Sequence, residues 1–349
     1  MKLEVRIRKR LRNFTLDASF ETQDEVFALL GASGCGKSMT LKCIAGLAQP
    51  DAGRIVLNGR VLYDSARGID LSPQKRRIGY LFQNFALFPN MTIADNIRFV
   101  ARGTKEEKER IVHENLVRFS LLEQEHAYPA ELSGGQQQRA ALARILATDA
   151  ELLLLDEPFS ALDSYLKWQL ELELMEVLAD YGGAALFVSH DRGEVYRLAS
   201  RVAVITRGRL EAVHPKKELF HNPTTLAATL LTGCKNVSRA KWIDARHVRA
   251  VDWEMDLCVA NAQEDVRYIG IRAHFMIHFE GPGNPAENVF RMEVVRIIED
   301  TFSYLVMVRR AETGGALMRW EIAKEKWRAI ETDAFCLYFP PEEIMQLVH

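Results

Sequence analysis

A glycine-rich segment, GASGCGKS at residues 31–38, has the residue types and spacing of a phosphate-binding loop. Glycines let the backbone wrap around an anion with successive N–H groups pointing inward, and a helix that starts behind the loop adds its positive end. Lys37 is spaced to reach the β- and γ-phosphates, and the Ser38 hydroxyl to bind Mg²⁺. The sequence therefore predicts a site for ATP and Mg²⁺ formed by Gly31, Ala32, Ser33, Gly34, Cys35, Gly36, Lys37 and Ser38.

Two carboxylates follow a run of four leucines in the segment LLLLDE at residues 152–157. Such a run predicts a buried strand, which delivers Asp156 and Glu157 at its end. Asp156 suits a role in holding Mg²⁺ opposite Ser38. Glu157 suits a general base that polarises the attacking water.

A second glycine-rich segment, LSGGQQQR at residues 132–139, precedes the good helix former AALARILA. A helix that begins here offers its positive end and free backbone N–H groups to an anion. The chain thus has one phosphate loop and a second candidate anion site, made by Ser133, Gly134, Gly135 and Gln136.

Three nearly continuous apolar runs are expected to be the strands that position these residues: EVFALL at 25–30, ELLLLD at 151–156 and AALFVS at 184–189. Strands of this kind alternating with longer helical patterns predict an α/β fold with a largely parallel sheet. Ligands bind outside the carboxyl ends of such strands. The apolar stripe in the helical pattern at 163–179 (Leu166, Leu170, Leu174, Val177 and Leu178) is interpreted as a packing face.

The chain changes character after about residue 232, where alternating stretches such as NVFRMEVVRI and SYLVMVRR lie between glycine and proline clusters. We therefore predict two domains: residues 1–232, of α/β type, and residues 233–349, a small β-rich domain. A length of 349 residues agrees with two hydrophobic cores.

Composition excludes several classes of protein. A formal net charge of −2 argues against bulk nucleic acid or an anionic lipid surface as the main partner. The sequence contains neither an apolar run of about 20 residues nor the apolar core of a signal peptide, so we expect a chain inside the cell. The five cysteines form no CxxC pair, which suggests neither a disulfide framework nor a zinc site.

The string LSGGQ resembles the signature of the ABC ATPases, and other elements of that family occur in the same order. The resemblance implies a P-loop ABC ATPase domain with a helical signature subdomain, working as a homodimer in which LSGGQ closes on the γ-phosphate held by the partner subunit. It further implies that Gln83, in YLFQN, contacts Mg²⁺ and the attacking water, and that His190 holds the γ-phosphate and orients Glu157. Asp163, in SALD, is expected to link the two nucleotide sites across the dimer.

Two aromatic features are interpreted through the same family. Many members stack adenine on an aromatic residue near the first two strands, where this chain has only Phe14, which we expect to be a strand residue facing the core. The segment NFALFPNM at 84–91 offers aromatic and methionine side chains, either as a buried loop or as anchors for a permease helix. The resemblance favours the anchors, which are Phe85, Leu87, Phe88 and Met91.

Residues 53–89 are similar to the ATP-binding subunit of molybdate-type importers. The tail resembles the small oxyanion-binding, OB-like β domain of those subunits. Here Pro285, Ala286 and Glu287 precede Asn288, where the family commonly has a serine and an arginine. Because an unpaired carboxylate repels an oxyanion, we expect the tail to stabilise a dimer in the first place and to bind a regulatory ligand in the second.

The function expected from the resemblance is ATP hydrolysis that drives molybdate or tungstate uptake through membrane permease subunits, fed by a substrate-binding protein. The subunit would lie peripherally on the cytoplasmic face of the inner membrane and bind no nucleic acid. One alternative is the same role for sulfate, ferric iron, polyamine or sugar. A second is a soluble ABC ATPase outside transport, which usually has two ATPase halves or a long coiled-coil insertion, and a third is an oxyanion-storage module.

Overall fold

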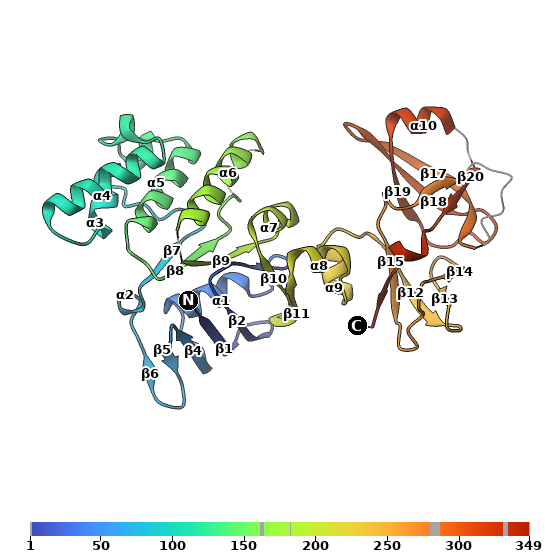
Figure 1. Ribbon diagram of the computed structural model, residues 1–349, viewed down its shortest axis with the longest axis horizontal. Helices are drawn as coiled ribbons and strands as arrows, with labels where there is room; N and C mark the ends of the chain where they lie inside the picture. The colour runs from blue at the N-terminus through green and yellow to red at the C-terminus, as the bar shows by residue number, and fades with distance from the viewer. Residues whose placement is uncertain (1, 161–163, 182, 280–286, 331–333, 349) are drawn as a thin grey trace. The chain divides into compact units, whose positions relative to one another are not determined.

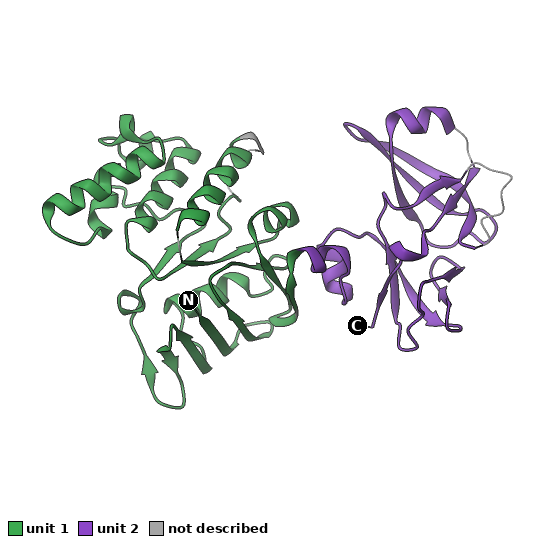
Figure 2. Cartoon of the chain, in the orientation of Figure 1, with its two compact units in different colours: residues 1–216 green, residues 217–349 purple. Residues whose placement is uncertain are grey.

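The computed structural model describes residues 2–160, 164–181, 183–279, 287–330 and 334–348. They form two compact units, Met1–Lys216 and Lys217–His349 (Figure 2). We predicted the domain boundary after residue 232, whereas the two units divide after residue 216. The helices α8 (Lys216–His221) and α9 (Leu226–Leu231) lie between these two positions. Arg272 of the second unit donates hydrogen bonds to the backbone oxygens of Phe220 and Thr232, which attaches the ends of these helices to that unit.

One sheet of 11 strands forms the centre of the first unit, in the order β6-β5-β4-β1-β2-β11-β10-β3-β9-β8-β7 (Figure 1). Its strands are β1 Leu3–Arg10, β2 Thr15–Thr22, β3 Val26–Leu30, β4 Ala52–Leu57, β5 Arg60–Asp64, β6 Ile69–Asp70, β7 Ile78–Leu81, β8 Leu152–Asp156, β9 Ala184–Ser189, β10 Arg201–Thr206 and β11 Arg209–Pro215.

The half of the sheet from β10 to β7 is parallel and confirms the three predicted apolar strands, which are β3, β8 and β9. Every residue of β8 and β9 is buried. Strands covered on both faces in this way bring their carboxyl ends to one edge of the sheet, which is the edge where the candidate residues were expected.

The other half, from β6 to β2, is antiparallel, so the expectation of a largely parallel sheet was wrong for this part. Buried and more exposed positions alternate strictly along β2 and through most of β1. This alternation is typical of antiparallel strands with one face on the core and one face toward water. The prediction relied on continuous apolar runs, which these strands do not have.

Helices cover the parallel strands, and α3, α4 and α5 pack on one another, with α5 also in contact with β7 (Figure 1). Leu170, Leu174, Val177 and Leu178 of α6 are buried, which confirms the predicted packing stripe for those residues. No helix in the described part of the chain has the length and apolar character needed to cross a membrane. The helices of this unit are α1 Lys37–Ala45, α2 Pro73–Arg76, α3 Ile93–Val100, α4 Lys105–Arg118, α5 Gly134–Leu146, α6 Ser164–Asp180 and α7 Arg192–Leu198, with 3₁₀ turns at Leu122–Gln124 and Pro129–Glu131.

The second unit is built on two five-stranded sheets, β14-β13-β12-β15-β21 and β16-β20-β17-β18-β19, and confirms the predicted β-rich region. Its core contains three tryptophans, Trp253, Trp320 and Trp327. The elements not yet given are β12 Asn236–Trp242, β13 His247–Ala250, β14 Met255–Cys258, β15 Tyr268–Ile271, β16 Ile277–Phe279, β17 Val289–Glu299, β18 Ser303–Arg310, β19 Met318–Ala323, β20 Ala334–Tyr338, β21 Met345–Leu347, α10 Lys324–Ile330 and the 3₁₀ turn Pro341–Glu343.

Candidate functional site

The loop at residues 31–38 joins β3 to α1 and has the backbone of an anion cradle. Gly34 and Gly36 have φ values of 78° and 112°, which L side chains rarely adopt. At Gly31 a Cβ would lie 2.4 Å from the backbone oxygen of Ile205, so only glycine fits. Ala32, Ser33 and Gly34 form the exposed tip, while Cys35 is buried. These features agree with the predicted phosphate loop, whose helix α1 presents its N-terminus to the same space.

Lys37 lies inside this loop. Its Nζ donates to the backbone oxygens of Gly31 and Ala32 at 2.8 and 3.0 Å, and the residue is only 4% exposed. The ammonium therefore lies where a bound phosphate can replace two carbonyl oxygens with stronger, charged acceptors.

Ser38 and Asp156 come together from elements 118 positions apart in the chain. The Ser38 hydroxyl donates to Asp156 Oδ1 at 2.6 Å, and the Tyr80 hydroxyl donates to Asp156 Oδ2 at 2.8 Å. Hydroxyl and carboxylate oxygens are the ligands that Mg²⁺ prefers, so this donor set fits the predicted ion. Tyr80 was missed by the sequence analysis. Burial first, and then the carboxylate, raise the pKa of Tyr80, so its proton stays on the phenol.

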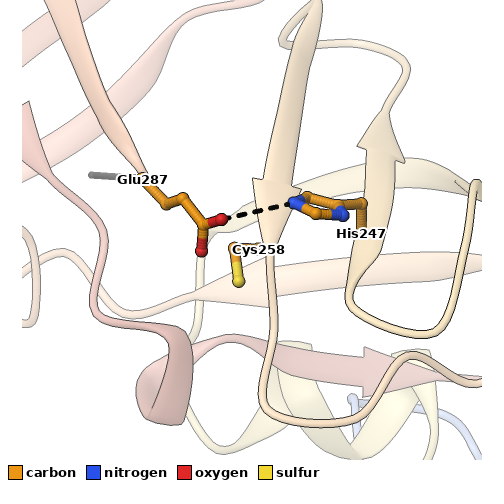
Figure 3. Close-up of side chains that lie close together, drawn as sticks. All are labelled: His247, Cys258 and Glu287. Carbon is orange, nitrogen blue, oxygen red and sulfur yellow. Dashed lines mark ion pairs between the residues drawn. The ribbon is translucent and has the colours of Figure 1, made fainter.

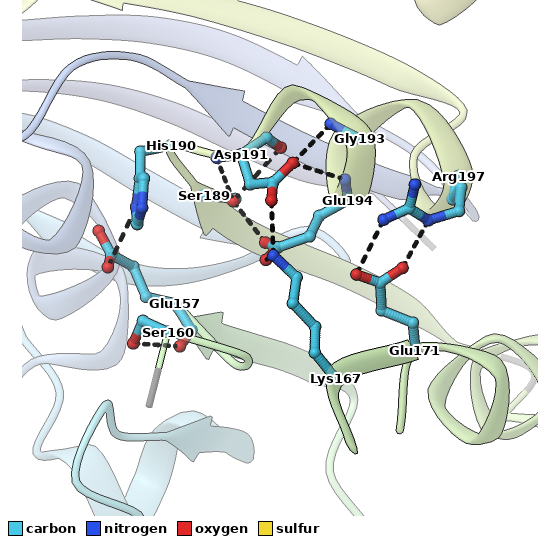
Figure 4. A network of polar contacts seen from close by, with 10 residues as sticks. All are labelled: Glu157, Ser160, Lys167, Glu171, Ser189, His190, Asp191, Gly193, Glu194 and Arg197. Atoms are coloured by element: carbon cyan, nitrogen blue, oxygen red, sulfur yellow. Dashed lines mark hydrogen bonds and ion pairs between the residues drawn. The ribbon is translucent and has the colours of Figure 1, made fainter. Parts of the chain in front are cut away.

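Glu157 and His190 follow the neighbouring strands β8 and β9, and Glu157 Oε2 lies 3.4 Å from His190 Nδ1 (Figure 4). Gln83 follows β7, and its amide donates to the Ser160 hydroxyl at 3.4 Å. The phosphate loop, His190, Glu157 and Gln83 thus follow four adjacent parallel strands, β3, β9, β8 and β7. Asp163 lies outside the described residues.

A network of charges holds the segment on either side of His190 (Figure 4). Asp191 caps α7 by accepting from the N–H groups of Gly193 and Glu194 at 2.7 and 3.3 Å. Lys167, from α6, lies 2.5 Å from Asp191 Oδ2 and 2.6 Å from Glu194 Oε1. Ser189 donates its hydroxyl to Glu194 and accepts from the Asp191 N–H. The two neighbours of His190 are therefore both fixed, a support that no motif indicated.

The second candidate anion site is a capped helix end. Ser133 is the N-cap of α5: its hydroxyl accepts from Gln136 N–H at 3.3 Å, and Gln136 Oε1 accepts from Ser133 N–H at 2.9 Å. Ser133 and Gly134 are exposed, Gly135 is buried, and a Cβ at Gly134 would meet nothing within 4 Å. This helix start is open to an approaching group.

A comparison with family models identifies the fold of the first unit. Residues 15–160 match the model described as ABC transporter. The first unit has the fold of an ABC ATPase domain. The match contains the phosphate loop, the LSGGQ segment and both carboxylates of the LLLLDE strand.

Curated relatives of the chain are named for several imported substrates. The chain is 42% identical over 219 residues to the "Spermidine/putrescine import ATP-binding protein PotA" of Acidothermus cellulolyticus, covering 62% of this chain and 56% of the relative. It is 38% identical over 232 residues to the "Fe(3+) ions import ATP-binding protein FbpC" of Haemophilus influenzae, covering 65% and 66%. It is 40% identical over 244 residues to the "Sulfate/thiosulfate import ATP-binding protein CysA 2" of Chromobacterium violaceum, covering 69% and 64%. The match therefore spans less than two thirds of each relative's length.

Solved structures share the fold of the ABC ATPase domain. One is a dimeric, post-hydrolysis state of the ATP-binding cassette MJ0796 bound to ADP and Pi, with 27% identity and a TM-score of 0.52, covering 62% of this chain and 99% of that one. Another is cbiO1 from Clostridium perfringens, part of the ABC transporter complex cbiONQ, with 26% identity and a TM-score of 0.55, covering 62% and 90%.

Phe14 of the first unit does not lie on a strand, contrary to our expectation. A turn closed by Leu11 N–H and the Phe14 backbone oxygen at 2.9 Å places it just before β2, half-buried. Its ring packs against the domain core and comes within 3.4 Å of the position that a Cβ on Gly36 would take. Phe14 thus lies beside the phosphate loop.

The predicted anchor segment is only partly available to a partner. Phe85 is buried, because Arg144 donates to the backbone oxygens of Phe85 and Ala86 and draws this turn against α5. Phe88 makes an edge contact with Phe99, whose ring centre is 5.0 Å away and which is 63% exposed. Phe85 was therefore wrongly expected as an exposed anchor, whereas Phe99 was missed.

Arg76 stabilises the helix that carries the phosphate loop and was also missed. The residue is fully buried and donates to the backbone oxygens of Cys43 and Ile44 at the end of α1, at 2.9 and 2.7 Å. It also donates to Leu71 O and Asp70 Oδ1, each at 2.8 Å. A positive group at a helix C-terminus satisfies carbonyls that have no partner within the helix.

Proposed function

We propose that this chain hydrolyses ATP as the motor subunit of a membrane importer. The observation that carries the proposal is the meeting of Ser38, Asp156, Glu157 and His190 at one sheet edge, with Ser38 2.6 Å from Asp156 and Glu157 3.4 Å from His190. Ser38 and Asp156 offer a hydroxyl and a carboxylate to a metal ion, and next to them Glu157 and His190 offer a carboxylate and an imidazole to an attacking water. These are the groups that transfer of a phosphoryl group to water requires.

In this proposal Lys37 and the loop N–H groups bind the β- and γ-phosphates. Ser38, Asp156 and Gln83 would hold Mg²⁺, which would neutralise charge on the phosphate oxygens when bound. Glu157 accepts a proton from the attacking water, and His190, held beside it, orients that carboxylate and donates a hydrogen bond to the γ-phosphate.

We further propose that the site is completed by a second copy of the chain. Ser133, Gly134, Gly135 and Gln136 offer an exposed helix N-terminus to the γ-phosphate bound by the partner subunit. Asp163 is assigned the role of linking the two sites. A related cassette was solved as a dimer with ADP and Pi, in support of this arrangement.

The imported substrate is proposed from the names of the relatives. These name polyamines, ferric iron and sulfate, which favours one of these substrates over the molybdate or tungstate suggested by residues 53–89. The same names favour transport over an ATPase outside transport. We propose that the subunit lies on the cytoplasmic face of the membrane, held by permease subunits through Phe88, Phe99 and their loop, and that residues 233–349 stabilise the dimer.

The test is ATP hydrolysis by the chain assembled with the permease encoded beside it. Binding protein loaded in turn with putrescine, Fe³⁺, sulfate or molybdate is added, and the rise in ATPase rate is measured, with Lys37→Ala as the control that should abolish every response. Stimulation by one of the first three supports the proposal. Stimulation by molybdate alone would show that molybdate is the substrate. An ATPase rate in the Lys37→Ala variant equal to that of the wild type would refute the motor function.

A further inference from the structure

Three side chains with metal-binding chemistry meet in the second unit: His247 from β13, Cys258 from β14 and Glu287 just before β17. Their ligand atoms all lie within 4.8 Å of one another, and Figure 3 shows the His247 ring facing the Glu287 carboxylate with Cys258 beside them. We propose that His247, Cys258 and Glu287 bind one divalent transition-metal ion of the zinc type. All three residues belong to the second unit, whereas the candidate ATPase residues lie in the first, so the metal-site proposal does not rest on the proposed function.

The donor set suits that ion. Imidazole nitrogen, thiolate sulfur and carboxylate oxygen bind Zn²⁺ at about 2.0–2.3 Å, which in a tetrahedral arrangement separates ligand atoms by about 3.4 Å. Closing the cluster from 4.8 Å therefore requires shifts on the order of 1 Å, within the range of a side-chain adjustment. Three protein ligands leave the fourth position for water or a further group.

The strand pairing sets two of the ligands opposite each other. His247 and Cys258 are directly paired across the antiparallel strands β13 and β14. Directly opposite residues on one face have Cβ atoms about 5 Å apart, close enough for a single ion to bridge their side chains. The cluster is thus set by sheet register instead of by a sequence motif, which explains why cysteine spacing gave no sign of it.

Asp244 orients the imidazole as an outer-shell carboxylate does in metal sites. Its two oxygens lie 2.9 and 3.0 Å from His247 Nδ1. A histidine that donates Nδ1–H to a carboxylate turns Nε2 toward a metal ion, and His247 Nε2 lies on the side of Glu287 Oε1, 3.8 Å away.

Asn288 fixes the third ligand beside the second. It is 5% exposed, with a φ of 63°, and its amide accepts from Cys258 N–H at 2.7 Å and donates to Cys258 O at 2.7 Å. A further bond to Phe339 O at 2.9 Å completes its partners. Because Asn288 follows Glu287 directly, this clamp holds the Glu287 backbone next to Cys258.

Arg246 supplies a positive charge to the cluster as it stands. Its Nη2 lies 3.3 Å from both Cys258 Sγ and Glu287 Oε2. The Glu287 carboxylate is therefore paired, whereas the sequence analysis had treated it as unpaired. The Arg246 side chain is 65% exposed and can swing into solvent when a metal ion takes its place. Arg246 would therefore compete with the metal ion for Cys258 and Glu287. Removing Arg246 should strengthen metal binding, which distinguishes a metal site from a simple ion-pair cluster.

The experiment is a Co²⁺ titration of the full-length, nucleotide-free protein, followed by the near-ultraviolet charge-transfer absorption of a cobalt-bound thiolate and by competition with Zn²⁺. The wild type should bind one equivalent with this absorption. Cys258→Ser should lose the absorption, whereas Cys336→Ser, which changes a partly exposed cysteine outside the cluster, should keep it. Asp244→Asn should weaken binding 10–100-fold, because it removes only the outer-shell charge. Arg246→Ala should tighten binding.

Far-ultraviolet circular dichroism checks that each variant is folded. If Cys258→Ser fails to fold, the test rests on Asp244→Asn and Arg246→Ala, which change exposed side chains. Absorption that survives Cys258→Ser in a folded protein, or that disappears equally in Cys336→Ser, would overturn the assignment. So would an Arg246→Ala variant that binds Co²⁺ no more tightly than the wild type.

Discussion

Lys167 is expected to fix the segment on either side of His190, and replacing it tests that role. Its ammonium lies 2.5 and 2.6 Å from carboxylate oxygens of Asp191 and Glu194, and the Glu194 side chain is only 5% exposed. Removing one partner of a buried ion pair costs about 3–5 kcal/mol. Because the Lys167 and Asp191 side chains keep 22% and 37% exposure, Lys167→Met should cost about 3 kcal/mol, the lower end of that range.

Hydrogen exchange of peptides from β9 and α7 measures this loss locally. A cost of about 3 kcal/mol corresponds to roughly a hundredfold faster exchange. Adding Glu194→Gln should restore part of the protection, because the cost of Lys167→Met lies mostly in leaving the Glu194 charge buried and unpaired. The ATPase rate of Lys167→Met should fall, since Ser189 and Asp191, on either side of His190, lose their common anchor.

The pH dependence follows from the same contacts. Burial works against both charges, but the carboxylates raise the pKa of Lys167 above its ordinary 10.5, and Lys167 lowers the pKa of Asp191 below its ordinary 3.8. The stabilisation should therefore be constant between these two values, and be lost as the pH rises through the raised lysine pKa or falls through the lowered aspartate pKa. Hydrogen exchange in Lys167→Met at the wild-type rate would refute the reasoning. So would a double variant whose loss of protection equals the sum of the losses in the two single variants.

Three further changes test the supports of the nucleotide site. Arg76→Lys should lower the free energy of unfolding by about 3 kcal/mol in urea titrations, because a lysine cannot replace four directed hydrogen bonds in a buried position; equal stability would contradict this. Phe14→Ala should weaken ATP binding by about 1 kcal/mol in calorimetry, with Phe14→Tyr as the control that retains a ring; an unchanged affinity would exclude stacking there. Tyr80→Phe removes a hydrogen bond to Asp156, so the Mg²⁺ concentration for half-maximal hydrolysis should rise 10–100-fold, and no rise would separate Tyr80 from the metal site.

The parallel half of the sheet could be predicted from sequence because its strands are continuous apolar runs. β3, β8 and β9 fall within one residue of the predicted EVFALL, ELLLLD and AALFVS segments. Strand ends then gather the loops that follow them, so the proximity of Ser38 to Asp156 and of Glu157 to His190 was predictable as well. The antiparallel half was not, because a strand such as TLDASFET carries a polar residue at every second position.

The supports of the site could not be predicted, because they depend on contacts between distant segments. Lys167 and Glu194 are 27 positions apart and separate motifs give no reason to pair them, while Arg76 reaches Cys43 and Ile44 across 33 and 32 positions. Long charged side chains are ordinarily found at the surface. The cluster around Cys258 depends in the same way on strand register, and its residues carry no local pattern.

The most direct test of the account is the ATPase rate of Glu157→Gln. The amide keeps the size of the side chain but cannot accept a proton from water, so turnover should fall by about 10²–10⁴-fold while ATP affinity stays the same and an ATP-bound dimer accumulates on gel filtration. Glu176→Gln, at an exposed position of α6, is the matched control and should hydrolyse ATP at the wild-type rate. A Glu157→Gln variant with full turnover would contradict the central claim that Glu157 activates the attacking water.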